Sequence, residues 1–323
     1  MREKHYFIVN PLAGKKDRTS EIQDKVESFF KIYKEKQYEI YVTKSKCDAT
    51  RFVKEECYKN PNHSLYFYSC GGDGTLNEVV NGAANYDNAI VSVIPYGSGN
   101  DFVRNFKDDV DFFDMDSILN GEVIDVDLIK VLDRYSVNIC NVGFDAKVAH
   151  NMNMFKKLPL VSGEFSYNLS VLYCLLNTLS SKFKITLDDD KVFEDDFLLS
   201  AIANGKCYGG GYKGVPLAEI SDGYIDICAI RTVSRFKLLS LLNLYKEGKH
   251  VGNEEVKKYV IYEKCKKVKI ESEKYFTICI DGETYIDKSV EFNICEKKIK
   301  FLLPSNVNNI KENHLIEVTI GNS

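Results

Sequence analysis

The sequence predicts a fold in two parts, an α/β domain followed by a mostly β domain. In the first third of the chain, short apolar segments alternate with segments whose apolar residues recur at helical spacing. After about residue 125, most segments are short, strand-like and separated by turns. The alternation predicts right-handed crossovers and a mainly parallel sheet. The later pattern predicts an antiparallel sandwich or barrel, with a boundary near residues 125–135.

The first part is expected to contain four strands joined by helices. A first helix is expected to open at Ser20, because Ser20 and Gln23 have capping-box spacing. Thr75 and Glu78 repeat that spacing, which predicts another helix start at Thr75. Ligands of such sheets bind at the carboxyl ends of the strands. The expected strands cover residues 5–10, 38–43, 65–70 and 89–95.

The second part is expected to be built almost entirely from strands. Residues 123–144 read as successive strands with a turn at Asp133-Arg134. One helix is expected near residues 164–182. The remaining segments are short and strand-like, as in YIDICAIR and YFTICIDGE.

Composition excludes several classes of protein. The 323 residues include 44% hydrophobic and 28% charged residues, which is ordinary for a soluble globular protein. The net charge of -4 argues against a nucleic-acid binder with a generally basic surface. No run of 18 apolar residues indicates a membrane span, and the N-terminus reads as a strand rather than a signal peptide. Ten cysteines without a C-x-x-C pair argue against structural zinc and for buried free thiols in a reducing cytoplasm.

The stretch LYFYSCGGDGTLNEVVNGA (65–83) joins a strand to a helix through glycines. A strand end, a glycine loop and a helix N-terminus together form an anion site, because unpaired N–H groups point outward there. The alternative is a tight turn in which glycine only relieves strain. From this stretch alone the two interpretations are level. Asp73 favours the anion site only if a metal ion bridges its carboxylate to a phosphate.

Two further loops at strand ends favour the phosphate interpretation. IPYGSGNDFVRNF (94–106) places Gly97, Ser98 and Gly99 before Asn100 and Asp101, although either of the last two could simply cap a helix. NPLAGKK (10–16) is the third such loop, and it lacks the spacing of a Walker P-loop. Loops that follow neighbouring parallel strands face the same edge of the sheet.

The segments NPLAG (10–14), GGDGT (71–75) and PYGSGNDF (95–102) resemble the nucleotide-site motifs of the diacylglycerol kinase catalytic-domain superfamily. The likeness is strongest to bacterial soluble diacylglycerol kinases and YegS-like lipid kinases. It extends to about Pro304, because later family motifs follow in order at 127–130, 134–148, 204–227 and 280–283. Ser98 stands where the family usually has threonine, which keeps the hydroxyl.

The resemblance implies a Rossmann-like α/β domain of the NAD kinase and phosphofructokinase type over residues 1–128. A strand near 296–304 returns to it. A β-sandwich lipid-kinase domain is implied over 129–295, and the tail at 305–323 has no counterpart. The positions similar to ATP-contacting ones are Asn10, Thr43, Gly71, Gly72, Asp73, Gly74, Thr75, Leu76, Asn77, Gly97, Ser98, Asn100 and Asp101.

Catalytic and metal positions follow from the same resemblance. Glu283 matches the proposed general base, with Asp281 beside it, and Asp73 is grouped with them as catalytic. Without the likeness, Asp281-Gly282 reads as a plain hairpin turn. The positions that resemble those organising Mg²⁺ are Asp101 and Asp127 in the phosphate network, and Asp222, Glu219 and Tyr224 around a second, structural ion.

The resulting prediction is an ATP- and Mg²⁺-dependent kinase for a lipid hydroxyl, with diacylglycerol converted to phosphatidic acid. The alternatives are a kinase for another lipid such as phosphatidylglycerol or a sphingoid base, an NAD kinase-like enzyme, or a nucleotide-binding regulator without catalysis. The expected partner is a lipid at a membrane surface, reached from the cytoplasm by peripheral association with the inner face. No nucleic acid is expected, and an exposed strand edge in the β domain could pair two copies as a homodimer.

Overall fold

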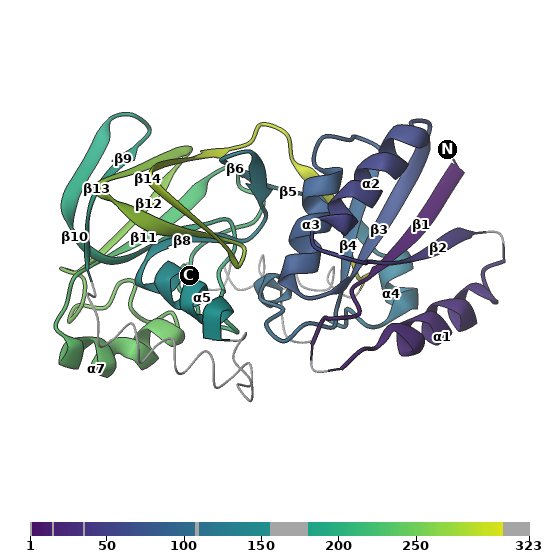
Figure 1. Ribbon diagram of the computed structural model, residues 1–323, viewed down its shortest axis with the longest axis horizontal. Helices are drawn as coiled ribbons and strands as arrows, with labels where there is room; N and C mark the ends of the chain where they lie inside the picture. The colour runs from purple at the N-terminus through teal and green to yellow at the C-terminus, as the bar shows by residue number, and fades with distance from the viewer. Residues whose placement is uncertain (1, 15, 35, 107–109, 156–179, 306–323) are drawn as a thin grey trace, which may run out of the picture. The chain divides into compact units, whose positions relative to one another are not determined.

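The computed structural model describes residues 2–14, 16–34, 36–106, 110–155 and 180–305 (Figure 1). Contacts within the chain divide it into two compact units. The first unit contains residues 1–126 and the segment that begins at Lys297. The second unit is Asp127–Glu296.

The first unit is built on a six-stranded sheet with the order β2-β1-β3-β4-β15-β5. Only β5 runs antiparallel to its neighbour, and the other pairings are parallel. In β4 every residue before the last is buried, as expected for a strand covered on both faces. The strands are β1 (Arg2–Val9), β2 (Gln37–Val42), β3 (His63–Gly71), β4 (Ala89–Pro95), β5 (Glu122–Val126) and β15 (Ile299–Leu303).

Helices cover both faces of this sheet (Figure 1). Because successive strand residues point to opposite faces, Phe7 packs with the side chains of α1 and α4, whereas Tyr6 contacts Phe52 of α2. Helix α3 lies beside α2, where a side chain on Gly82 would collide with Val53. The helical segments are α1 (Thr19–Phe30), α2 (Asp48–Lys59), α3 (Asp73–Ala83), the 3-10 turn η1 (Phe102–Asn105) and α4 (Met115–Leu119).

Both predicted capping boxes are wrong. Helix α1 begins at Thr19, and its cap position makes no side-chain hydrogen bond. Helix α3 begins at Asp73 rather than Thr75, again without a side-chain cap. The carboxylate of Glu78 instead accepts the N–H groups of Cys47 and Ala49 at the start of α2. The spacing of Thr75 and Glu78 therefore pointed to a residue that caps a helix, Glu78, but it assigned that residue to α3 instead of α2.

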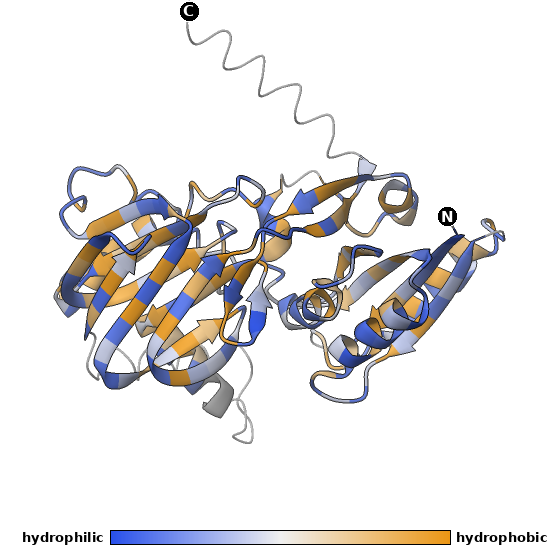
Figure 2. Ribbon diagram, turned by 90° about the horizontal axis from the view of Figure 1, so that it is seen from above, coloured by the Kyte–Doolittle hydropathy of each residue, from blue (hydrophilic) through white to orange (hydrophobic). Residues whose placement is uncertain are grey.

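In the described part of the second unit, nine strands form a sheet with antiparallel pairings. Several strands alternate between hydrophilic and hydrophobic residues (Figure 2), as in β9, whose inward side chains belong to the largest apolar cluster of this unit. The strands are β6 (Ile129–Val131), β7 (Arg134–Ser136), β8 (Ile139–Gly143), β9 (Ser181–Leu187), β10 (Lys191–Ala203), β11 (Ile225–Arg231), β12 (Val260–Cys265), β13 (Lys267–Ile280) and β14 (Glu283–Ile294).

The two units confirm the predicted fold class, an α/β part with a mainly parallel sheet and an antiparallel β part. Helices α5 (Phe144–Phe155) and α7 (Arg235–Lys246) were not predicted. Helix α7 has leucines on most sides and no acidic residue, so it lacks the one-sided periodicity that marks a helix in a sequence. The helix expected near 164–182 lies outside the described residues, except that its end falls in β9.

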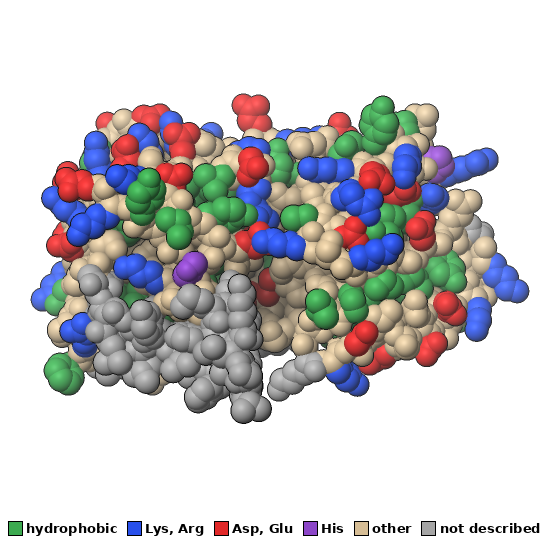
Figure 3. Space-filling model, viewed as in Figure 1, with side chains coloured by type: hydrophobic (Ala, Val, Ile, Leu, Met, Phe, Trp, Pro, Cys, Tyr) green, Lys and Arg blue, Asp and Glu red, His purple; other side chains and the backbone are tan. Residues whose placement is uncertain are grey.

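Surface properties agree with the composition. Basic and acidic side chains are interspersed on the face shown in Figure 3, so its described residues form no continuous basic surface. Nine cysteines are described as free thiols, and seven of them are buried. Among the described helices, none has the length and apolar character needed to cross a membrane.

Candidate functional site

Three loops of the first unit meet at the carboxyl edge of its sheet. The side chain of Asn10, after β1, donates a hydrogen bond to the hydroxyl of Thr75 over 3.0 Å. The N–H of Gly97, after β4, donates to the carbonyl of Gly71 over 3.1 Å. These hydrogen bonds bring together the ends of β1, β3 and β4. The three loops were predicted to face the same edge of the sheet, and they do.

The approach of these loops leaves no room for side chains at several glycines. A Cβ on Gly97 would lie 2.3 Å from the Cα of Gly72, and a Cβ on Gly71 would lie 2.3 Å from the Thr75 hydroxyl oxygen. Contacts this short do not occur between ordinary atoms, so these positions require glycine. The plainer of the two sequence interpretations, a turn that needs glycine for steric reasons, therefore holds at Gly71 and Gly97.

Gly74 is different, because packing does not explain it. A Cβ on Gly74 would have no heavy atom of the protein within 4 Å. The residue is exposed and lies in the first turn of α3, where backbone N–H groups have no partner within the helix. The space beside Gly74 is open to a ligand at the positive end of the helix dipole.

Two carboxylates converge beside Gly99. A Cβ on that glycine would lie 2.9 Å from Oδ2 of Asp73 and 3.3 Å from Oδ2 of Asp101. The other oxygen of Asp73 accepts the N–H groups of Asp101 and Phe102 over 2.7 and 3.2 Å. Burial raises the pKa of Asp73, because desolvation outweighs the bonds from those N–H groups. The two carboxylates form an acidic pair next to the glycine loops.

The remaining positions of the PYGSGND loop have distinct surroundings. Asn100 has a positive φ of 50°, and its side chain donates to the carbonyls of Pro95 and Gly97, each over 2.9 Å. Asn100 therefore holds the loop closed. The side chain of Ser98 is exposed beside it.

Thr43, Leu76 and Asn77 lie around this edge in different ways. Thr43 follows β2, and its N–H donates to the carbonyl of Val9 over 2.9 Å. Leu76 and Asn77 are each only 1% exposed. Their side chains pack inside the protein, so a ligand would meet the main chain of α3 rather than these groups.

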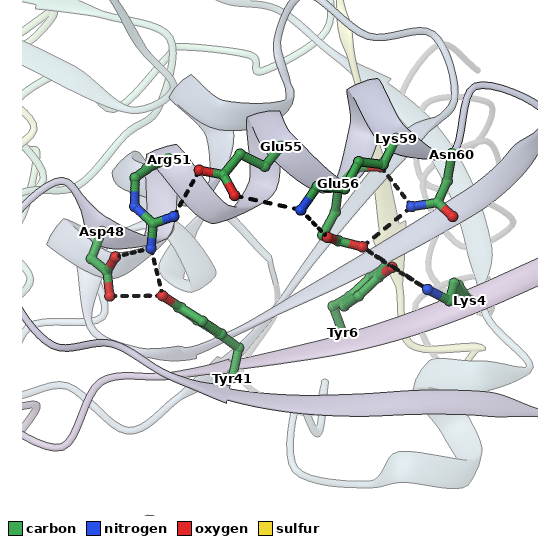
Figure 4. A network of polar contacts seen from close by, with 9 residues as sticks. All are labelled: Lys4, Tyr6, Tyr41, Asp48, Arg51, Glu55, Glu56, Lys59 and Asn60. Carbon is green, nitrogen blue, oxygen red and sulfur yellow. Dashed lines mark hydrogen bonds and ion pairs between the residues drawn. The ribbon is translucent and has the colours of Figure 1, made fainter.

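The loop after Thr43 is held by α2 through a network of polar contacts (Figure 4). Asp48 accepts the N–H of Lys44 and the hydroxyl of Tyr41, and it pairs with Arg51 over 2.7 Å. Further along α2, Glu56 accepts the hydroxyl of Tyr6 over 2.6 Å. Helix α2 is thus anchored to both β1 and β2 near the site.

Glu78 extends this connection to the glycine loop, because it lies on α3 and caps α2. The substitution Glu78→Ala leaves the N–H groups of Cys47 and Ala49 without their acceptor. We expect the free energy of unfolding to fall by about 1–2 kcal/mol, the usual range for loss of a cap. Chemical denaturation measures this change. Glu55→Ala, which removes only surface pairs on α2, is the control and should leave the transition in place. Equal transitions for all three proteins would contradict the capping role.

In the second unit, Glu283 begins β14 and is paired with an arginine. Nη1 of Arg134, in β7, donates to Oε2 of Glu283 over 2.5 Å. Arg134 also bonds the hydroxyl of Tyr285, which itself donates to Oε2 of Glu283 over 3.1 Å. The three side chains form a closed, partly buried cluster. Neither Arg134 nor Tyr285 was predicted as a site residue, since each falls inside a segment that reads simply as a strand or a turn.

Asp281 holds a neighbouring loop. Its Oδ1 accepts the hydroxyl of Ser136 and the N–H groups of Asn138 and Ile139 over 2.8–3.3 Å. Its Oδ2 accepts the N–H of Val137 over 3.0 Å. Asp281 and Gly282 both have positive φ, of 43° and 90°, as a two-residue hairpin turn requires. The carboxylate therefore fixes residues 136–139 against this hairpin.

The predicted structural metal site contains a lysine. Asp222 forms a short ion pair with Lys264, whose Nζ also lies 3.5 Å from the buried Asp226. Asp222 accepts the N–H of Tyr224, whereas Glu219 is exposed. Asp127 also belongs to this region, since its Oδ2 accepts the N–H of Gly223 over 2.6 Å. Within the described ranges, no group of three or more His, Cys, Asp or Glu residues is arranged to hold a metal ion.

Two known families account for most of the chain. Residues 4–131 match the diacylglycerol kinase catalytic domain, and residues 138–303 match the YegS C-terminal NAD kinase beta sandwich-like domain. The second match alone covers more than half of the chain.

Individual relatives give the same result. The diacylglycerol kinase of Staphylococcus carnosus is 29% identical over 314 residues, which is 96% of this chain and 98% of that protein. That of Staphylococcus aureus strain MRSA252 is 29% identical over 311 residues, or 96% and 95%. The crystal structure of a diacylglycerol kinase from Bacillus anthracis has a TM-score of 0.66 at 21% identity, over 94% of this chain and 98% of that one, which shows the fold. The chain therefore belongs to the family that carries the YegS C-terminal domain behind a diacylglycerol kinase catalytic domain, and it is an enzyme of the lipid-kinase class.

Proposed function

We propose that this enzyme transfers the γ-phosphoryl group of ATP to the primary hydroxyl of diacylglycerol and forms phosphatidic acid, with Mg²⁺ as cofactor. The observation that carries the nucleotide part is the open space at Gly74, at the N-terminus of α3, beside the acidic pair Asp73 and Asp101. Main-chain N–H groups at such a terminus bind phosphate oxygens. We propose diacylglycerol as the acceptor because the relatives are named diacylglycerol kinases.

The acidic pair fits a magnesium ion that arrives with the nucleotide. Mg²⁺ is usually bound by one or two carboxylates and by substrate phosphates, so the absence of a larger cluster among the described residues agrees with this use. Asp73 and Asp101 would hold the ion, which would neutralise charge on the phosphate oxygens. Desolvation raises the pKa of Asp73, and a cation bound beside the carboxylate would oppose that effect.

The transfer itself needs little from the protein beyond position and charge. The oxygen of the acceptor hydroxyl bonds to the γ-phosphorus, the bond from that phosphorus to the β–γ bridging oxygen breaks, and ADP leaves. We propose that the carboxylate of Glu283 accepts the hydroxyl proton. Asp281 is assigned to holding the 136–139 loop, because both of its oxygens already accept hydrogen bonds from that loop.

No step depends on the second magnesium ion that the family resemblance implies. That ion, on Asp222 and the main chain of Glu219 and Tyr224, would have to compete with Lys264 for the Asp222 carboxylate. The lipid acceptor implies that the enzyme works at a membrane surface, so we also propose reversible association with a bilayer.

One assay tests the function. The purified protein is incubated with γ-labelled ATP and Mg²⁺, and with mixed micelles of diacylglycerol, of phosphatidylglycerol or of a sphingoid base, with NAD, or with no acceptor. We expect label in phosphatidic acid. Label in a different lipid would show that this lipid is the acceptor. Label in NAD and in no lipid would overturn the proposed lipid-kinase activity. ATP binding without any transfer would favour a nucleotide-binding regulator.

The substitution Gly74→Ala separates ligand binding from folding. Alanine meets no protein atom at this position, and replacing a helical glycine should raise the stability of the free protein by about 0.5 kcal/mol. If phosphates occupy this space, the added methyl group should weaken ATP binding about tenfold or more. Isothermal titration calorimetry and thermal unfolding measure the two effects.

Gly97→Ala is the matched comparison, because its Cβ would lie 2.3 Å from the Cα of Gly72. That variant should lose both stability and ATP binding. Wild-type ATP affinity in Gly74→Ala would show that the phosphates lie elsewhere.

A further inference from the structure

Two hairpins of the second unit bring Arg134 to Glu283, although 149 residues separate them in the sequence. Arg134 opens β7 directly after a tight turn, opposite Val131 of β6. Strand β6 also pairs with β14, with Val131 opposite Phe292, and β14 begins with Glu283. That pairing lies at the far end of β14, nine residues from Glu283. The start of β14 meets β7 through the β13–β14 turn instead, because Asp281 in that turn accepts hydrogen bonds from Ser136 and Val137 at the end of β7.

Two side chains donate hydrogen bonds to the same carboxylate oxygen of Glu283. Arg134 and Tyr285 both donate to Oε2 of Glu283, and they bond each other as well. The guanidinium carbon lies 5.7 Å from the centroid of the Tyr285 ring, which adds a cation–π contact. The side chains of Arg134 and Glu283 are only 16% and 23% exposed. A carboxylate bonded twice at one oxygen is restricted in its orientation.

Arg134 stays charged in this setting. Burial by itself lowers the pKa of Arg134, but the hydrogen bonds to Glu283 and Tyr285 more than offset this, and the pKa lies above its usual value. Removing one partner from such a partly buried ion pair removes the opposite charge that offsets the desolvation of the other.

We propose that Arg134 is a positioning residue for phosphoryl transfer: together with Tyr285 it orients the Glu283 carboxylate and keeps it ionised. The inference rests on the proposed role of Glu283 as proton acceptor. Arg134 acts through Glu283 and does not itself touch the reacting atoms. A carboxylate paired with a cation is a weaker base. A weak base suffices here, because a loose transition state for phosphoryl transfer depends more on the orientation of the hydroxyl than on early removal of its proton.

The pH dependence of turnover reports on this pair. An opposite charge at hydrogen-bond distance favours the ionised carboxylate, so loss of Arg134 should move the acid limb of the profile to higher pH, by about one unit. A purely structural role would lower stability without moving that limb. The other titratable groups beside this cluster are Asp281 in the β13–β14 turn, Cys279 on β13, Cys140 on β8, and His150 on α5 next to Thr284.

The test compares Arg134→Met, Arg134→Lys and Glu283→Gln with the wild type, using diacylglycerol micelles and ATP varied up to saturation between pH 5.5 and 9. For Arg134→Met we expect kcat to fall about 10- to 100-fold with an unchanged KM for ATP, and the acid limb to shift upward. Arg134→Lys should restore the acid limb but only part of kcat, because lysine keeps the charge but its flexible side chain does not hold the donor as rigidly as the planar guanidinium. A double variant that combines Arg134→Met with Glu283→Gln should have a kcat no lower than that of Glu283→Gln alone, since we propose that the arginine acts through that carboxylate.

Arg231→Met is the control, because it removes an arginine from an exposed pair with Asp195 in the same unit. It should keep wild-type turnover and pH profile. Wild-type turnover in Glu283→Gln would overturn the proposed proton acceptor itself. An inactive Glu283→Gln beside an Arg134→Met enzyme with wild-type kcat or an unshifted acid limb would overturn only the positioning role. If the methionine variant does not fold, Arg134→Lys decides by kcat alone, because a wild-type kcat in the lysine variant would overturn the positioning role.

Discussion

Asp73→Asn is expected to lose phosphoryl transfer by about 10²-fold or more while the free protein stays as stable as the wild type or becomes more stable. The asparagine side chain can still accept the N–H groups of Asp101 and Phe102, so the loop should keep its shape. What it loses is the negative charge that we propose to hold Mg²⁺ beside the phosphates. A loss of activity without a loss of stability would separate this role from a structural one.

The sign of the stability change follows from the raised pKa of Asp73. A carboxyl group whose pKa is higher in the folded than in the unfolded protein binds more protons when the protein is folded. The free energy of unfolding therefore falls as the pH rises above 3.8, the ordinary pKa of the group, through its folded value. Asparagine avoids that penalty. The advantage of Asp73→Asn should therefore be present at pH 7 and disappear as the pH falls below 3.8.

Thermal unfolding without ligand at several pH values, paired with a titration of Mg²⁺ in the transfer assay, measures both effects. Glu21→Gln removes a surface carboxylate on α1 and serves as the control. Normal activity with an unchanged Mg²⁺ requirement in Asp73→Asn would show that this carboxylate does not hold the metal.

Asp281→Ala should produce the largest loss of stability. Four donors of residues 136–139 lose their acceptor, and bonds to a charged acceptor contribute about 1.5–3 kcal/mol each without being additive. We expect the free energy of unfolding to fall by about 3 kcal/mol or more. Part of the loss comes from the positive φ of 43°, which alanine adopts poorly.

Asp281→Asn separates the two contributions, because asparagine tolerates positive φ and lacks the charge. The free energy of unfolding of Asp281→Asn should lie between those of the wild type and Asp281→Ala. The chain has no tryptophan, so urea unfolding is followed by far-UV circular dichroism. Asp195→Ala, which breaks an exposed pair with Arg231, should change stability by less than about 1 kcal/mol. If Asp281→Ala unfolds at the same urea concentration as that control, the loop is held by other contacts.

The sequence predicted most of the fold because the pattern of apolar residues changes near residue 125. The central strand β4 of the first sheet is nearly all apolar, as expected when both faces are covered, whereas β9 alternates, as expected when one face is buried. The loops around Gly72 and Gly97 were predicted to lie together because parallel strands end at one edge. Helix α7 was missed because its leucines surround the helix.

Contacts between distant residues could not be predicted from the sequence. Spacing alone placed Glu78 in a capping box of its own helix, whereas the fold brings the start of α2 within its reach. Arg134 was read as part of a turn, and only the contacts of Asp281 with residues 136–139 explain how β7 comes beside Glu283. Partners of this kind follow from topology, so a single sequence gives no local signal for them.

Strand β15 determines the order in which the enzyme can be completed during synthesis. It lies between β4 and β5 in the first sheet, although the whole second unit separates it from them in the chain. Until β15 has left the ribosome, the facing edges of β4 and β5 lack the strand that joins them, and open strand edges favour association with other chains. The second unit has no such dependence, since its strands all lie between Asp127 and Glu296. The unit proposed to bind the nucleotide is therefore the first to be translated and the last to be finished.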